Sequence, residues 1–155
     1  MGETKCIGVG DTAPDFVLND NREKSVKLSD YRGRNILLSW HPLAWTPVCA
    51  EQMKSLEAHV ADFEQLNTTA FGLSVDSVPC KNQWAKQLLI AQTRLLSDFW
   101  PHGAVALSYG LFRNQEGFSE RANVLLDSEG KVIWVKIYPI SELPDITEVL
   151  AHCAQ

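Results

Sequence analysis

The sequence predicts an α/β domain with a mixed central sheet, helices on both of its faces and a hairpin at its N-terminal end. Apolar runs of strand length alternate along the chain with amphipathic segments of helical length, which is typical of this class. The 155 residues, 45% of them apolar, can bury one sizeable core but are too few to suggest two domains. We therefore expect a single domain over residues 1–155.

The elements follow from the pattern of apolar residues and turn signals. Two short runs, 15–19 and 25–28, are joined by a polar turn and indicate the opening hairpin. Further strands are expected at 35–40, 70–75, 95–97, 122–126 and 131–137, and a tight turn containing Gly130 joins the last two. Helices are expected at 47–66, 79–90, 102–109 and 141–153. The first of these helices carries one apolar stripe at steps of three and four, formed by Cys49, Met53, Leu56, Val60 and Phe63.

Composition and charge narrow the choice of partners and compartment. The 14 basic and 19 acidic residues give a net charge of −5 and form no basic tract, so nucleic acid and anionic membranes are not expected partners. No apolar run approaches the ~20 residues that span a bilayer. The N-terminal stretch lacks the apolar core of a secretory signal, and its Met-Gly start is followed by Cys6 where a myristoylation motif has Ser or Thr. We expect a cytoplasmic protein.

The four cysteines, at positions 6, 49, 80 and 153, do not form a metal-binding pattern. They include no C-x-x-C pair and have no nearby His at zinc-ligand spacing, so a structural zinc site is not expected. In a reducing compartment a cysteine is by default a small buried hydrophobic residue, and a reactive one needs its own local argument. Only Cys49 clearly has one.

Cys49 lies at the start of the helix expected over 47–66. Thr46 is a suitable N-cap and Pro47 suits the first helical position, which makes Cys49 the third helical residue. The free amides of the first turn and the positive end of the helix dipole favour thiolate over thiol. Lowering a thiol pKa from about 8.5 to about 6 raises the thiolate fraction at pH 7 about thirtyfold, which is worth roughly 2 kcal/mol. Enzymes commonly lower the activation free energy by about 8 kcal/mol or more. Further donors must therefore orient a substrate and stabilise its leaving group.

The residues around Cys49 resemble a known active site. The string Pro42-x-x-x-Thr46-x-x-Cys49 is similar to the peroxiredoxin motif, and Arg121, just before a late strand, matches a further arginine of that family. The likeness covers almost the whole chain. Residues 10–16 resemble the family's opening, residues 74–77 with Trp84 resemble its middle, and residues 96–105 closely resemble the alkyl hydroperoxide reductase E branch of the AhpC/TSA family.

Membership of this family implies a thioredoxin-like fold, no metal or organic cofactor, and reduction of hydrogen peroxide, alkyl hydroperoxides or peroxynitrite. By position, the resemblance makes Cys49 the peroxidatic nucleophile, Thr46 a hydrogen-bond partner of both sulfur and peroxide, Pro42 a shield against solvent, and Arg121 the cation that activates thiolate and peroxide. Attack leaves a sulfenic acid, which a thiol must reduce. The implied reductant is of the thioredoxin, glutaredoxin or low-molecular-weight-thiol type, and a homodimer is expected.

Three residues near the motif are candidate modulators. His41 stands where relatives usually have an aromatic residue, and a His beside a cysteine can also act as the base of a Cys–His pair. Gln52 occupies a position where many relatives have Glu, which puts any charge-dependent role of that position in doubt. Trp84 is most simply a core or interface aromatic, in a segment that lies near the active site in this branch.

The thiol that reduces the sulfenic acid is left open by the sequence. Cys80 lies at an expected helix start, a position that can activate a thiol, although similarly placed cysteines in some peroxiredoxins belong to a subunit interface. The family's usual C-terminal resolving segment is not recognisable around Cys153, and Cys6 is a weaker candidate. A cycle with one protein cysteine and an external thiol is the leading option.

Two other functions fit parts of the pattern. Residues 45–49 look like a thioredoxin Trp-Cys-x-x-Cys with Thr46 in place of the first cysteine, which suggests a disulfide oxidoreductase that lacks its exposed nucleophile. A redox-sensing or holdase-like interaction module on the same fold would retain Cys49 but would need no catalysis.

Overall fold

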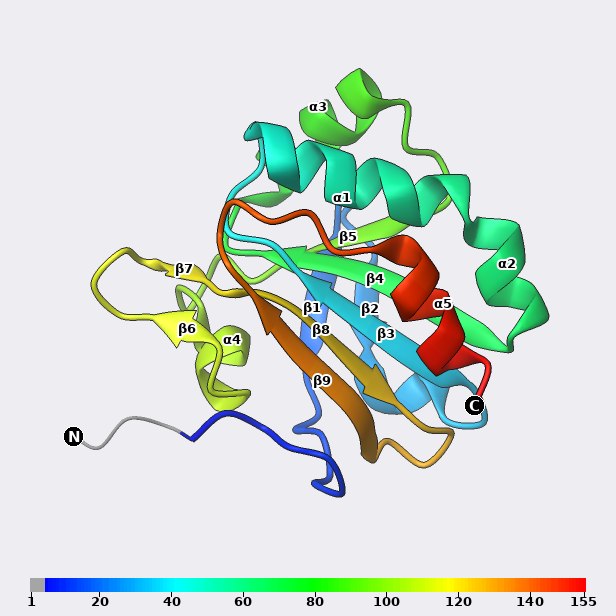
Figure 1. The fold of residues 1–155 in the computed structure, drawn as a ribbon. Helices are drawn as coiled ribbons and strands as arrows, with labels where there is room; N and C mark the ends of the chain where they lie inside the picture. Colours follow the sequence, from blue (N-terminus) through cyan, green and yellow to red (C-terminus); the bar gives the residue numbers. More distant parts are fainter. Residues whose placement is uncertain (1–4) are drawn as a thin grey trace.

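The computed structural model describes residues 5–155 and has a seven-stranded sheet at its centre (Figure 1). The Met-Gly start discussed above lies outside the described residues. The sheet contains β1 (Val17–Asp20), β2 (Ser25–Lys27), β3 (Asn35–Trp40), β4 (Thr68–Ser74), β5 (Arg94–Ser97), β8 (Arg121–Leu126) and β9 (Val132–Tyr138). A separate short pair consists of β6 (Phe112–Arg113) and β7 (Phe118–Ser119).

The sheet is mixed, as the sequence predicts. The strand order is β2-β1-β5-β4-β3-β8-β9. β4 runs parallel to its neighbours β3 and β5, whereas the remaining neighbours pair antiparallel. β1 and β2 form the expected opening hairpin, and β8 and β9 form the later one.

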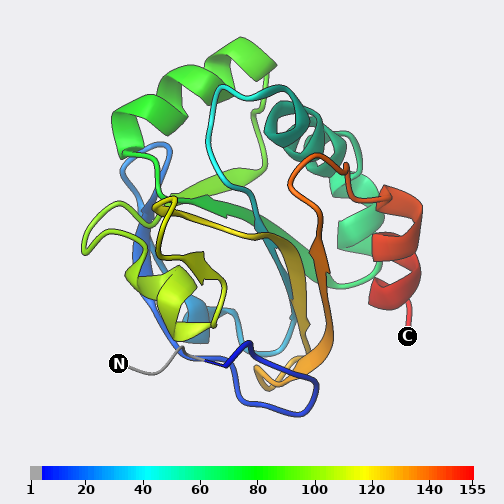
Figure 2. The ribbon, with the colours of Figure 1, turned by 60° about the vertical axis from the view of Figure 1, so that its left-hand side comes forward.

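Helices cover both faces of the sheet (Figure 2). They are the 3-10 helix η1 (Leu28–Tyr31), α1 (Pro47–Ala58), α2 (Val60–Gln65), α3 (Val78–Leu88), α4 (Ala104–Ser108) and α5 (Ile146–Cys153). Side chains of α1, α2, α3 and α5 share one apolar cluster. α4 and the segment before β1 contribute to a second cluster on the opposite face. None of the helices within residues 5–155 is long and apolar enough to cross a membrane.

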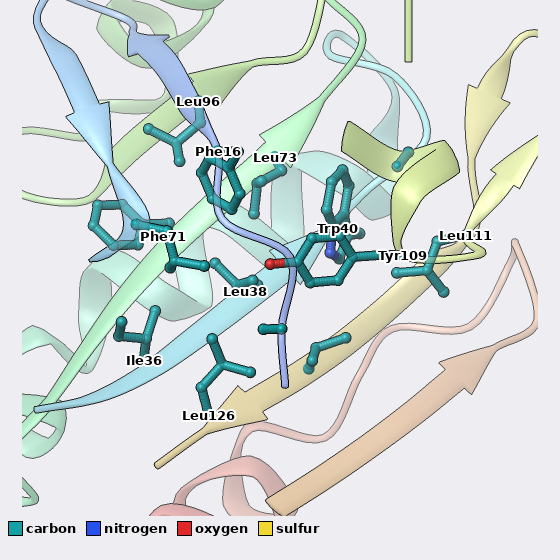
Figure 3. Close-up of a cluster of buried hydrophobic side chains, with 14 of the residues drawn as sticks. Phe16, Ile36, Leu38, Trp40, Phe71, Leu73, Leu96, Tyr109, Leu111 and Leu126 are labelled. Carbon is teal, nitrogen blue, oxygen red and sulfur yellow. The ribbon is translucent and has the colours of Figure 1, made fainter. Parts of the chain in front are cut away.

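The second cluster lies on the face of the sheet opposite α1 and α3 (Figure 3). Trp40 and Tyr109 pack with ring centroids 5.8 Å apart, and the Tyr109 hydroxyl donates to the Pro14 carbonyl at 2.7 Å. Because side chains alternate along a strand, Trp40 and its neighbours at steps of two face this cluster, whereas Leu37 faces the cluster of α1 and α3. Ser39 therefore lies on the face that carries Cys49.

The structure differs from the expected elements in three places. The helix expected over 47–66 is divided at His59, whose backbone at φ −114° and ψ 19° leaves the helical region between α1 and α2. The helix expected over 141–153 begins only at Ile146, because Pro144 disfavours helix before it and Asp145 caps the start by accepting from the Thr147 amide at 2.9 Å. The β6–β7 pair has only two residues in each strand, too few for a periodic signal.

Candidate active site

Cys49 occupies the first turn of α1, as the sequence predicts. Thr46 is the extended N-cap residue, Pro47 is the first helical residue and Cys49 is the third. The first intrahelical bond runs from the Ala50 amide to the Thr46 carbonyl, so the amides of Val48 and Cys49 are left for other acceptors. The Cys49 side chain is wholly buried. The sulfur thus lies away from water in the first turn, at the positive end of a helix.

The Thr46 hydroxyl does not cap α1. It donates to the Leu43 carbonyl at 2.8 Å and accepts from no amide of the described chain. Neither the expected side-chain cap nor the implied hydrogen bond from Thr46 to the Cys49 sulfur is formed within residues 5–155. Because its hydrogen is engaged by Leu43, the hydroxyl oxygen keeps its lone pairs available as acceptors.

Arg121, at the start of β8, reaches the sulfur directly. Its Nη1 donates to Cys49 Sγ at 3.3 Å and to Gln52 Oε1 at 2.8 Å. The other edge of the guanidinium donates from Nε and Nη2 to the Ile140 carbonyl, at 2.9 and 2.7 Å. The planar group is thus held on two sides and directs a buried positive charge at the cysteine.

Gln52 holds this arrangement without adding a charge. It lies one turn after Cys49 and is buried. Its Nε2 donates to the Ser39 hydroxyl at 2.8 Å and to the Trp40 carbonyl at 3.1 Å, which leaves Oε1 to face Arg121. Since the Trp40 carbonyl can only accept, the contact with it needs an N–H, which an amide supplies and a carboxylate does not.

The loop between β3 and α1 is anchored from β4. Asp76 Oδ2 accepts from the Ala44 amide at 2.8 Å and from the Ser74 hydroxyl at 2.6 Å. Pro42 is buried within this loop, and Trp45 is half exposed with a left-handed backbone at φ 68°. Such a conformation costs a non-glycine residue on the order of 1 kcal/mol. Asp76 is an anchor that periodicity does not reveal, although an acidic residue soon after a buried strand is a usable signal.

His41 and Trp84 lie together with Lys81, a residue that no motif in the sequence marks. Lys81 Nζ is 3.3 Å from His41 Nε2, and the rings of His41 and Trp84 are 5.4 Å apart. Within residues 5–155 no hydrogen bond joins His41 to Cys49. Burial, followed by the charge of Lys81, holds the pKa of His41 well below its usual range. The missed signal is helical spacing, because Lys81, Trp84 and Ala85 share the buried face of α3.

The three other thiols are disfavoured as nucleophiles by their surroundings. Burial and the nearby carboxylate of Asp76, whose Oδ1 is 3.8 Å from the sulfur, raise the pKa of Cys80. Burial raises the pKa of Cys153 to about 11, and burial together with Glu120 raises that of Cys6. The activation suggested by the position of Cys80 at a helix start is thus outweighed by its neighbours. All four cysteines are free.

Sequence comparison relates the chain to proteins of one family over most of its length. Residues 9–135 match the AhpC/TSA family. The chain is 39% identical over 140 residues to alkyl hydroperoxide reductase E of Mycobacterium tuberculosis, covering 90% of this chain and 91% of the relative. It is 31% identical over 148 residues to peroxiredoxin-2 of Mus musculus, covering 88% of this chain and 74% of the relative.

Solved structures with the same fold belong to the same group of proteins. The reduced 2-Cys peroxiredoxin of Plasmodium vivax superposes with a TM-score of 0.86 at 26% identity, covering 94% of this chain and 79% of the other. Peroxidoxin BcpB of Mycobacterium tuberculosis superposes with a TM-score of 0.82 at 25% identity, covering 94% and 95%. These matches confirm the expected thioredoxin-like fold.

Proposed function

Because this chain belongs to the AhpC/TSA family and is a peroxiredoxin, a thiol-dependent peroxidase, we propose that Cys49 is the thiolate that attacks the hydroperoxide. The observation that carries the assignment is the hydrogen bond from Arg121 Nη1 to Cys49 Sγ. A buried guanidinium directed at a sulfur stabilises the anion, which is the nucleophilic form. The substrates are hydrogen peroxide, alkyl hydroperoxides or peroxynitrite.

In the reaction, the thiolate attacks one peroxide oxygen, so that an S–O bond forms as the O–O bond breaks. The sulfur loses two electrons and becomes a sulfenate, which takes up a proton from solvent to give the sulfenic acid. The second oxygen receives the peroxide O–H proton and leaves as water or alcohol, whereas peroxynitrite releases nitrite. Arg121 and the free amides of the first turn stabilise the charge that moves onto the leaving oxygen. Thr46 accepts a hydrogen bond from the peroxide O–H through the lone pairs that its contact with Leu43 leaves free.

Access to the sulfur requires local motion. Cys49 and Pro42 are both buried, which supports the role of Pro42 as a shield that limits the contact of the sulfur with water. The loop that precedes α1, or the first turn of α1 itself, must shift to admit peroxide and later the reducing thiol. The strained Trp45 in this loop lowers the cost of that shift, because movement releases its left-handed conformation.

An external thiol completes the cycle in this proposal. The raised pKa values of Cys6, Cys80 and Cys153 leave them mostly as unreactive thiols at neutral pH. A thioredoxin, a glutaredoxin or a low-molecular-weight thiol then reduces the sulfenic acid. A reducing cytoplasm suits this chemistry, since the cysteines are needed in the free form.

The proposed assembly is a homodimer. Val17, Phe99 and Trp100 are exposed apolar side chains that line one shared cavity together with Val78 and Pro79. Two copies joined through this patch would remove it from water. Light scattering tests the assignment, because Trp100→Glu is then expected to give a monomer.

Stopped-flow mixing of the reduced protein with hydrogen peroxide, followed by tryptophan fluorescence, tests the function. We expect oxidation far faster than that of a free low-pKa thiol, and no fast phase in Cys49→Ser. A wild-type rate equal to that of the free thiol overturns the assignment and favours a redox-sensing module. Insulin reduction by the wild type would instead favour a disulfide oxidoreductase.

Mass spectrometry after one equivalent of peroxide tests the resolving step. We expect a sulfenic acid on Cys49 in both the wild type and Cys80→Ser. A disulfide between Cys49 and Cys80 in the wild type would show that Cys80 is the resolving thiol.

A further inference from the structure

A lysine and a histidine that the proposed chemistry does not use lie buried near the active site. Lys81 from α3 and His41 from the end of β3 are both wholly inaccessible to solvent. Their side-chain nitrogens, Nζ and Nε2, are 3.3 Å apart. Such a pair is expensive to bury, so its surroundings must compensate for the charge it carries.

Lys81 forms no ion pair within the part of the chain that the structure describes. The acidic group that attracts it is Asp76, whose carboxylate is already engaged by the Ala44 amide and the Ser74 hydroxyl. The face of Trp84 lies 6.0 Å from Nζ and adds a weak cation–π attraction. Burial lowers the pKa of Lys81 to about 8, opposed by attraction to Asp76 and the sulfurs of Cys80 and Cys49. The carboxylate of Asp76 and the His41 Nε2 acceptor both favour the ammonium form of Lys81.

His41 is the neutral member of the pair. Burial lowers its pKa, and the charges of Lys81 and then Arg121 act in the same direction, with partial opposition from the backbone of Ser39. A neutral imidazole that accepts from an ammonium at Nε2 carries its own proton on Nδ1. The pair therefore places one positive charge, on Lys81, in the apolar surroundings that Trp84 shares with Cys49.

We propose that Lys81, held in place by neutral His41, is a positioning residue that supplies a second buried positive charge to the active site and, together with Arg121, stabilises the Cys49 thiolate. The inference rests on the proposed function of Cys49. Screening between Lys81 and the sulfur is weak, because the apolar cluster of α1 and α3 excludes water and salt. Arg121 acts by contact and Lys81 acts through space.

The charged and titratable groups around this site come from five parts of the fold. They are Arg121 on β8, His41 after β3, Asp76 after β4, Lys81 and Cys80 on α3, and Cys49 itself on α1. Arg121 and the ammonium form of Lys81 are the cations of this set. Loss of the Lys81 charge therefore leaves a single cation to oppose the thiolate.

The test is the pH dependence of Cys49 alkylation by iodoacetamide, with the modified peptide quantified by mass spectrometry. In Lys81→Met we expect the midpoint of the rate profile to rise by about one pH unit, which is about a tenfold loss of reactivity below the midpoint. Lys86→Met is the matched control, because Lys86 is an exposed lysine on the same helix. It is expected to match the wild type.

His41→Phe removes the acceptor of the lysine and is expected to raise the midpoint as well. The double variant His41→Phe/Lys81→Met replaces the polar pair by apolar groups, which keeps the fold measurable if a single variant unfolds. The midpoint of the double variant is expected to shift by as much as that of Lys81→Met, and not by the sum of the shifts of the two single variants. A folded Lys81→Met or double variant with the wild-type midpoint overturns the proposal. Alkylation needs no peroxide, so this result is independent of whether Cys49 acts as a peroxidase.

Discussion

The guanidinium of Arg121 donates from Nη1 to the sulfur of Cys49 at 3.3 Å, across 72 positions of sequence. Sheet pairing produces this contact. Trp40 on β3 is paired with Ala122 on β8, which places Arg121 beside the point where the chain leaves β3 for the active-site loop. The Ile140 carbonyl then fixes the opposite edge of the guanidinium.

Arg121→Lys is expected to slow oxidation of Cys49 by peroxide about a hundredfold. Lysine keeps the charge, but a point-like ammonium cannot contact the sulfur, Gln52 and the Ile140 carbonyl together in one plane. Stopped-flow tryptophan fluorescence measures the rate. Arg113→Lys is the control, because Arg113 pairs with Glu120 at 3.0 Å outside the site, and its rate should equal that of the wild type. An unchanged rate in Arg121→Lys would show that charge alone suffices.

Thr46→Val is expected to reduce the peroxide rate by at least about a hundredfold while lowering the free energy of unfolding by only about 1 kcal/mol. The valine keeps the shape but removes the acceptor for the peroxide, and the stability loss is that of one bond to the Leu43 carbonyl. Thr46→Ser retains the hydroxyl and should recover most of the activity. Equal rates in the Val and Ser variants would exclude the hydroxyl from the reaction.

Gln52→Leu is expected to lower the free energy of unfolding by about 2 kcal/mol and the peroxide rate by about tenfold. The change leaves the Ser39 hydroxyl and the Trp40 carbonyl without their buried donor and frees one edge of Arg121. Urea denaturation and stopped-flow fluorescence measure the two effects. Gln65→Leu, at an exposed position of α2, should change neither quantity.

Glu57→Gln is expected to destabilise the fold by about 1 kcal/mol at pH 7, with a difference that disappears in acid. Burial raises the pKa of Glu57, but hydrogen bonds from the amides of Ala91, Thr93 and Gln92 lower it further, so that the net shift is downward. A carboxyl whose pKa is lower in the folded state stabilises the fold at pH values above its pKa in the unfolded chain, about 4.3. This stabilisation is lost as the pH falls through the pKa in the folded state.

Thermal unfolding of Glu57→Gln and the wild type between neutral pH and about pH 3 measures this difference. Glu51→Gln, an exposed change on the same helix, should give pH-independent differences close to zero. A Glu57→Gln deficit that stays constant into acid would mean that the side chain acts by packing instead of by its charge.

The sequence by itself determined the local features of this protein. Thr46 and Pro47 predict where α1 begins, the apolar stripe predicts that Cys49 faces inward, and the run 35–40 predicts β3 with its observed bounds. These features depend on residues within a few positions of one another, so periodicity and helix-start signals report them. Arg121 was found only through family resemblance, because nothing in its neighbourhood distinguishes it from a surface arginine.

Only the tertiary structure decided which distant groups meet and how far each is desolvated. The end of β3 and the buried face of α3 bring His41 to Lys81, although 40 positions separate them. Helix-start geometry alone would activate Cys80, whereas burial and the Asp76 carboxylate raise its pKa. The physical reason is that charge energetics depend on the dielectric and on neighbours from every packed element, and strand register and helix packing set both at long range.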